Sequence, residues 1–282
     1  MKNTKTRARP GGWAAGTAGA DPLDQLVHLS HLMGQDTRLV QPGGGNTSTK
    51  VGDTLLVKGS GTDLRTITRE GFTRLSLGRL AALREAESMS DAEMMRFMAG
   101  CMIAEGPAPS VETPLHSLLP HRVIAHTHDV ATMSLTNVRD DVSERLVGEL
   151  FEGRIVYVPY VRPGFPLARA VGRMVGGVEG RRGGGIPDGA IGLVLAHHGL
   201  VVWGDDAEQC YAHLLKITGQ MDEYLAKKRN ARPSDRPSAR PPLRPSDDRR
   251  ELAELVLPVV RGALSRPDRV ILHYDDADDV LA

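Results

Sequence analysis

Two short apolar segments that end in histidines constrain the fold of this chain most strongly. They are VIAHTH at residues 123–128 and LVLAHHG at residues 193–199. Apolar runs of this length are typical of buried β-strands, and the glycine after the second pair of histidines permits a tight turn. Because open sheets tend to place functional groups where their strands end, we expect these histidines, at the ends of two strands, to be functional.

The H-x-H segment offers two imidazoles to a single metal ion. His126 and His128 lie two positions apart, so on a strand their side chains project from the same face. Zinc in a catalytic site takes a third protein ligand and keeps one position open. His198 is the best third donor and His197 is the competing choice, because a strand arriving from Leu195 points neighbouring side chains in opposite directions. An H-x-H pair alone is also common in chains that bind no metal.

Strand-like and helix-like segments alternate along the chain without a regular βαβ period. Asp21 and Pro22 suit the N-cap and first position of a helix, and Asp205 and Asp206 can cap a later one. We expect helices over residues 23–33, 91–105, 166–175 and 207–228, strands over residues 55–58, 123–128, 154–160 and 191–204, a glycine-rich turn over residues 41–50, and a loop running into a helix over residues 109–119. This pattern favours an α/β fold, a three-layer α/β/α sandwich with a mixed, largely antiparallel central sheet.

Composition divides the chain into four parts. Residues 1–20 are expected to be a disordered tail and residues 21–228 the main domain. Residues 229–248 are rich in Arg, Pro, Ser and Asp and are typical of a linker. Residues 249–282 are expected to form a short helix and strand. The chain stops eight residues after Tyr274, as an incomplete, truncated unit would.

The charge balance and the cysteines exclude several classes of protein. The 35 basic and 35 acidic residues give a formal net charge of zero, so there is no general reason to expect binding to nucleic acid or membranes. No apolar run approaches the roughly 20 residues that span a bilayer, and the N-terminus lacks the apolar region of a secretory signal. Cys101 and Cys210 lie far apart, so we expect two neutral thiols in the reducing cytoplasm.

Glu112 is the candidate carboxylate, fourteen residues before His126. A carboxylate beside a metal can bind the ion when no substrate is present, or act as an acid or base once substrate displaces it. The alternative is a glutamate at the start of a helix, where the helix dipole favours a negative charge.

Two glycine-rich segments form a candidate phosphate site. Residues 43–48 (GGGNTS) and 58–62 (KGSGT) offer backbone N–H groups, hydroxyls and the charge of Lys58. Neither segment matches the Walker or dinucleotide-binding pattern, and a pair of ordinary turns would look similar.

The segments GGGNTS, KGSG, PSVETPLH, HTH and HHG, in this order, resemble the class II aldolase/adducin family. The resemblance spans about residues 21–225. Within the family, VRPGFPLA and the terminal LHYDD make the sequence most similar to the aldolase region of proteins that join a rhamnulose-1-phosphate aldolase-like part to a short-chain dehydrogenase. Those proteins carry aspartate where this chain has Glu112, and we find no glycine-rich dehydrogenase fingerprint here.

The resemblance implies a site and a fold. It implies zinc, or another divalent transition metal, on His126, His128 and His198, and it prefers His198 over His197. It makes Glu112 the catalytic carboxylate. It implies that the phosphate of a small sugar substrate is bound by Gly45, Asn46, Ser60, Gly61 and Ser110. It also implies a mixed sheet between helices and assembly as a homotetramer.

The reaction that the resemblance implies is a class II aldol cleavage. A ketose 1-phosphate would yield dihydroxyacetone phosphate and an aldehyde through a zinc-stabilised enediolate. Sugar-phosphate epimerases and dehydratases of the same fold are alternatives. A non-enzymatic interaction domain like that of adducin is a further alternative, although adducin-like domains lack the metal-binding histidines that this chain keeps.

Overall fold

The computed structural model describes residue 13 and residues 19–41, 44–175 and 185–230. The chain divides into two units, residues 1–228 and 229–282. All the elements below belong to the first unit, apart from the last two residues of its final helix. The expectations for the N-terminal tail, the linker and the C-terminal segment concern residues that lie almost entirely outside the described part.

Helices and strands alternate through the first unit. The helices are α1 (Pro22–Gln35), η1 (Arg69–Gly71), α2 (Leu77–Leu80), η2 (Ala81–Arg84), α3 (Asp91–Cys101), α4 (Thr113–Leu118), α5 (Val130–Thr136), α6 (Asp140–Phe151), α7 (Phe165–Val175) and α8 (Ala207–Asn230). The strands are β1 (Asn46–Val51), β2 (Thr54–Lys58), β3 (Phe72–Ser76), β4 (Val123–Thr127), β5 (Ile155–Val158), β6 (Gly192–Leu195) and β7 (Gly199–Gly204). In the described part, no helix is both long and apolar enough to cross a membrane.

The described strands form one sheet in the order β3-β2-β1-β4-β7-β6-β5. Its five neighbouring pairs from β3 to β6 are antiparallel, and β5 alone runs parallel to its neighbour β6. The expectation of a mixed, largely antiparallel sheet is therefore confirmed. Strand β4 lies at the centre of the sheet and pairs along one edge with β1 and along the other with β7.

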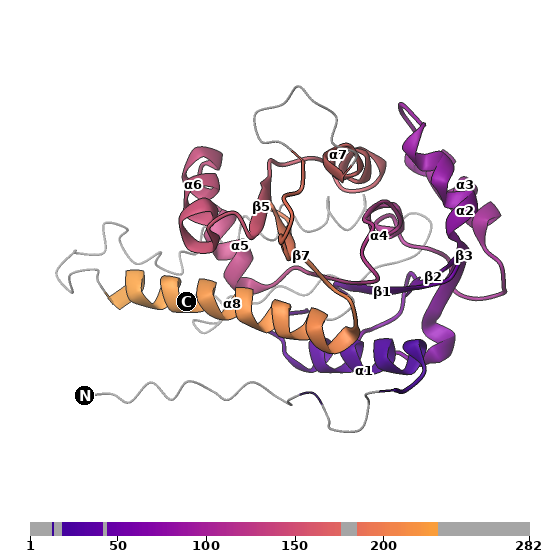
Figure 1. The fold of residues 1–282 in the computed structure, drawn as a ribbon, viewed down its shortest axis with the longest axis horizontal. Helices are drawn as coiled ribbons and strands as arrows, with labels where there is room; N and C mark the ends of the chain where they lie inside the picture. The colour runs from indigo at the N-terminus through magenta and orange to yellow at the C-terminus, as the bar shows by residue number, and fades with distance from the viewer. Residues whose placement is uncertain (1–12, 14–18, 42–43, 176–184, 231–282) are drawn as a thin grey trace, which may run out of the picture. The chain divides into compact units, whose positions relative to one another are not determined.

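Helices cover both faces of the sheet, as the three-layer prediction requires (Figure 1). Alternate strand residues enter different cores: Leu56 belongs to the core that includes residues of α1, α5, α6 and α8, whereas Leu55 and Val57 belong to the core that includes residues of α2, α3, α4 and α7. This alternation follows from the period of two in a β-strand. Asn46 and Ser48 of β1 contact Glu112 and His116 on the face covered by α4.

Residues 41–50 contain a central strand that the sequence did not predict. We expected only a glycine-rich turn, but β1 begins at Asn46, directly after Gly45, whose φ is 70°. The strand is polar and nevertheless buried, because its hydroxyls have internal partners. Thr47 Oγ1 lies 2.7 Å from the hydroxyl of Ser30. Hydrogen-bonded hydroxyls can be buried at little cost, so a polar strand is stable here.

Most expected helices are present, with different ends. Asp21 caps α1 by accepting a hydrogen bond from the N–H of Leu23, as predicted. Helix α3 ends at Cys101 and not near residue 105, because Met102 is extended and forms a bridge with Leu75 of β3. Pairing with the sheet therefore competes with, and ends, the helix.

Candidate metal centre

Four side chains converge on one point at the end of the central strand. Glu112, His126, His128 and His198 each offer one ligand atom, and these atoms lie within 4.8 Å of one another. The three imidazole centroids are 4.8, 4.9 and 4.9 Å apart. The sequence-based candidates for a metal site are therefore brought together by the fold.

The four side chains come from three segments of the chain. His126 lies in β4, and His128 follows the last residue of that strand. His198 lies in the turn between β6 and β7, where the N–H of His198 donates to the carbonyl of Leu195. Glu112 is the N-cap residue of α4. Antiparallel pairing of β4 with β7 places the two histidine segments side by side.

The ring nitrogens face one another closely. Nε2 of His128 lies 3.0 Å from Nε2 of His126 and 3.1 Å from Nε2 of His198. Oε1 of Glu112 lies 3.0 Å from Nε2 of His198 and 3.3 Å from Nε2 of His126. Ligands about 2.0–2.1 Å from a tetrahedral zinc ion are roughly 3.3 Å apart, which is close to this spacing.

The tautomer of His126 is set by the neighbouring strand. Its Nδ1 lies 2.9 Å from the carbonyl oxygen of Leu200, which can only accept a hydrogen bond, so Nδ1 carries the proton. In the neutral ring, Nε2 then presents its lone pair to the other histidines. A carbonyl behind a histidine is the arrangement that orients imidazole ligands in metal sites.

His197 points away from the cluster. Its Nε2 lies 3.0 Å from Oδ1 of Asp140 at the start of α6, and its φ of 54° is in the left-handed region. A non-glycine residue in this region is strained by about 1–3 kcal/mol, so the contact with Asp140 helps to hold the turn. Of the two adjacent histidines, only His198 faces Glu112.

Glu112 is held in the ionised form. Its side chain is 12% exposed, and the amide of Asn46 donates a hydrogen bond to Oε2. Burial raises the pKa of Glu112, but the charge of His126 and hydrogen bonds from His126 and His198 outweigh it, so the pKa lies well below its usual value. A carboxylate is therefore available beside the imidazoles at neutral pH.

His126 and His128 differ in proton affinity. Burial lowers the pKa of His126, but the neighbouring Glu112 carboxylate raises it above its usual value. Burial and the charge of His126 lower the pKa of His128 to about 4. His128 is thus a neutral donor, and the cluster has the three nitrogens and one oxygen that zinc binds.

The loops predicted to bind phosphate lie next to Glu112. The N–H of Ser60 donates to the carbonyl of Ala108 at 2.8 Å, which joins the loop after β2 to the loop before α4. Ser110 in the second loop accepts a hydrogen bond from the N–H of Glu112 at 3.3 Å. Gly61, with a φ of 77°, has open space around its Cα. The two loops are therefore brought together.

Gly45 and Asn46 have structural roles in addition to any role in ligand binding. A Cβ on Gly45 would lie 3.0 Å from the carbonyl oxygen of His126, so a side chain there would press on strand β4 beside a proposed metal ligand. Asn46 bonds the Glu112 carboxylate. No sequence pattern indicates this contact, because Asn46 and Glu112 are 66 residues apart in the chain.

As a whole residue Lys58 is only 4% exposed, but its Nζ is not among the enclosed unpaired atoms of the described residues, so the ammonium group itself reaches the surface. Burial lowers its pKa, and the charges of Asp63 and Glu112 partly offset this. An accessible ammonium group in this loop suits an anionic ligand.

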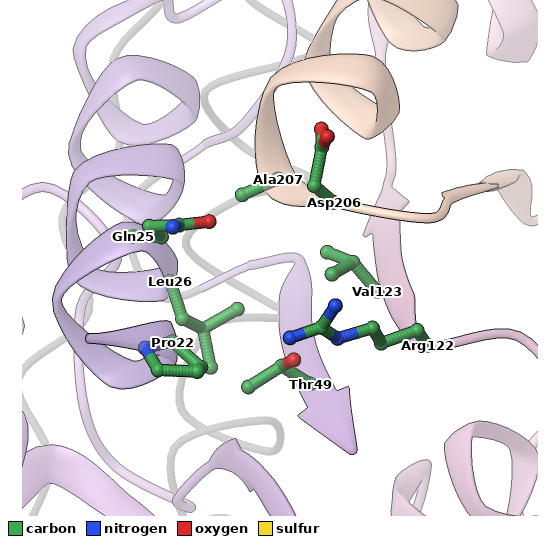
Figure 2. A pocket seen from close by; sticks show the side chains of 8 residues that line it. All are labelled: Pro22, Gln25, Leu26, Thr49, Arg122, Val123, Asp206 and Ala207. Carbon is green, nitrogen blue, oxygen red and sulfur yellow. The ribbon is translucent and has the colours of Figure 1, made fainter. Parts of the chain in front are cut away.

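A small pocket at the opposite end of β4 is not part of this site (Figure 2). It is lined by residues of α1, β1 and the start of α8 together with Arg122 and Val123, and its volume is about 10 Å³. That is room for about one water molecule. Val123 is the first residue of β4, three positions before His126, which places the pocket roughly 10 Å along the strand from the histidines.

Comparison with known proteins gives matches over most of the chain. The family described as class II aldolase and adducin N-terminal domain matches residues 24–223. The Bacillus subtilis (strain 168) protein "Uncharacterized oxidoreductase YuxG" is 35% identical over 269 residues, which cover 92% of this chain and 37% of that protein. The chain therefore spans well under half the length of this relative.

Solved structures show the same fold. The N-terminal class II aldolase domain of a conserved protein from Thermoplasma acidophilum has a TM-score of 0.67 and 30% identity, covering 77% of this chain and 98% of that one. A sugar-phosphate aldolase from Thermotoga maritima has a TM-score of 0.53 and 13% identity, covering 75% and 97%. At this identity the second likeness shows the fold alone.

Proposed function

The chain belongs to the class II aldolase and adducin family, and we propose that it is a metal-dependent aldolase that cleaves a ketose 1-phosphate into dihydroxyacetone phosphate and an aldehyde. The observation that carries this proposal is the convergence of three imidazole nitrogens and the Glu112 carboxylate on one point. The match of residues 24–223 to the class II aldolase and adducin family supports the choice of an aldolase.

A purely structural role does not account for this cluster. Imidazoles with ring nitrogens 3.0 and 3.1 Å apart, beside a buried carboxylate, contribute little to stability compared with apolar side chains of similar size. One bound cation would satisfy all four groups at once. The cluster therefore favours an enzyme over an adducin-like interaction domain.

The chemistry divides between the metal and the residues around it. A divalent metal on His126, His128 and His198 would supply Lewis acidity, which stabilises negative charge on substrate oxygens during carbon–carbon cleavage. Glu112, ionised and 3.0 Å from His198, is placed to accept and return a proton. The amide of Asn46 keeps that carboxylate in one orientation.

The phosphate is proposed to lie between the two loops near Glu112. Lys58 would contribute its charge, and the hydroxyls of Ser60 and Ser110 and the backbone at Gly61 would contribute hydrogen bonds. Binding the phosphate would fix the rest of the sugar for cleavage. We further propose that zinc is the metal, that the protein is a homotetramer, and that it acts in the cytoplasm.

Metal analysis and product analysis test the proposal together. We expect about one zinc per chain in the purified protein, lost in His126→Ala and kept in a control, His213→Ala, whose imidazole contacts the carbonyl of Trp203 instead. A panel of ketose 1-phosphates should release an aldehyde. An inverted sugar would identify an epimerase, and loss of water a dehydratase. No metal, together with unchanged activity in His126→Ala, would refute the proposal.

A further inference from the structure

Strand β1 and helix α4 are joined by a row of polar contacts, which we name the polar ladder. Three alternate residues of β1 each contact one position of α4 or its caps. The contacts are Asn46 Nδ2 to Oε2 of Glu112, Ser48 Oγ to Nδ1 of His116 at 2.7 Å, and Lys50 Nζ to the carbonyl oxygen of Leu119.

The spacing of the ladder follows from two regular periods. Alternate residues on a strand point to one face and repeat about every 6.6 Å. Residues four apart on a helix lie on one face and repeat about every 6 Å. Asn46 and Ser48 therefore match Glu112 and the residue four positions later, His116. Two matched contacts fix both the position of α4 along the strand and its rotation about its own axis.

His116 is an unusual choice for the middle of this interface. It is fully buried, and Nε2 has no hydrogen-bond partner among the described residues. A hydrogen bond to Ser48 stabilises the fold by about 1 kcal/mol, whereas an unpaired buried nitrogen costs about 1–3 kcal/mol. Leucine would fill similar space without an unpaired nitrogen. Stability alone therefore does not account for a histidine here.

Orientation of the catalytic carboxylate does account for it. All six residues of α4 are buried, and Leu115 and Leu118 hold the helix in the apolar core. Apolar packing is not directional, so the hydrogen bonds of the ladder are the contacts that specify its rotation. A small rotation of α4 about its axis would move Glu112 away from His198, which now lies 3.0 Å from Oε1. The partner of His116, Ser48, lies on the rigid centre of the sheet, where β1 pairs with both β2 and β4.

We propose that His116 is a positioning residue, which through its hydrogen bond to Ser48 holds α4 in the rotation that presents the Glu112 carboxylate to His198 and the metal. The meaning of this for catalysis rests on the proposed function. The position of the carboxylate does not, because it can be measured on the metal-free protein.

The test compares two variants of the intact chain with the wild type. The double variant His116→Leu, Ser48→Ala removes the hydrogen bond and leaves no nitrogen or hydroxyl unpaired. His116→Asn is the rescue variant, because the asparagine amide reaches the place of the histidine Nδ1 and can still bond Ser48. If the double variant does not fold, Ser48→Ala alone removes the contact with a smaller change.

Two measurements read the position of Glu112. The side-chain ¹⁵N shifts of His198 in the metal-free protein report its contact with Glu112. Titration with Co²⁺, followed by its visible absorption, reports metal affinity and coordination. We expect the double variant to unfold at the same or higher denaturant concentration, yet to shift the His198 signals and bind Co²⁺ about tenfold more weakly. His116→Asn should restore both.

The inference and the proposed function can fail separately. Unchanged His198 shifts in a folded double variant would overturn the positioning role, whatever the metal result. If the wild type binds no Co²⁺, the proposed function fails, while the His198 shifts still decide the role of His116. Loss of stability in the double variant, with unchanged His198 shifts, would show that His116 serves packing only.

Discussion

Gly199→Ala should damage the metal centre more than any other replacement of one glycine by alanine near it. Gly199 is the first residue of β7 and follows His198. A Cβ built on Gly199 would lie 2.1 Å from the carbonyl oxygen of Thr127 and 3.2 Å from Cδ2 of His128. Contacts below 3.0 Å essentially never occur, so strands β4 and β7 would have to separate by about 0.9 Å.

The structure sets the size of the effect. The clash is with backbone and not with the end of a flexible side chain, so it cannot be relieved by a rotamer change. Overpacking of this kind costs about 1–3 kcal/mol of unfolding free energy. Thr127 lies between His126 and His128, so both ligands move with it. A displacement of about 1 Å at a reactive site reduces activity on the order of 100-fold.

Gly148→Ala is the matched control. Gly148 lies in α6, and a Cβ there would meet nothing within 4 Å. Alanine should stabilise this helix by about 0.4–1 kcal/mol. Urea unfolding followed by circular dichroism gives the two free energies, and zinc content by mass spectrometry gives the state of the site. A Gly199→Ala protein as stable as the control, with a full complement of zinc, would refute the reasoning.

Three further predictions concern His116, the bound metal and Glu112. Burial and the charges of His126 and Lys50 lower the pKa of His116 from 6.5 to about 3, despite the opposing charge of Glu112. As the pH falls below 6.5, only the unfolded chain therefore takes up a proton at this histidine. The free energy of unfolding should fall by about 2 kcal/mol by about pH 5 for this reason. Urea unfolding near neutral pH and at about pH 5 should show this loss in the wild type and not in His116→Asn. An equal loss in the two proteins would contradict the prediction. Removal of metal by a chelator should lower the unfolding free energy by about 2.7 kcal/mol if free metal had been at 100 times its dissociation constant, and an unchanged melting curve would count against a bound metal. Glu112→Gln should keep zinc but reduce kcat by about 10²–10⁴-fold, measured by aldehyde release, and a mutant with normal kcat would remove Glu112 from the mechanism.

The sequence predicted the ends of strands better than the contacts between them. The apolar runs before His126 and His198 marked β4 and β6 correctly. His197 and His198 point apart as predicted, but they lie in the turn between β6 and β7 and not on a strand, and the left-handed backbone of His197 directs it to Asp140 while His198 faces Glu112. Spacing alone could not choose between them, because the choice depends on which face α4 covers.

The polar strand β1 shows what sequence patterns leave out. Asn46–Lys50 has no apolar residue, so it looks like a turn, yet it forms a central strand. Its hydroxyls are satisfied by residues far away in the chain, such as Ser30 and His116. The spacing of four between Glu112 and His116 was a visible signal, but its meaning required the facing strand.

The wide separation of the ligands in the chain has a consequence for folding rates. His198 is 70 residues from His128 and 86 residues from Glu112. Closing a loop of this length costs chain entropy before its contacts can compensate for the loss, so such contacts form late in folding. Interactions absent from the transition state slow unfolding and leave the folding rate almost unchanged. A bound metal should therefore lower the unfolding rate, and so lengthen the lifetime of the native state, without raising the folding rate.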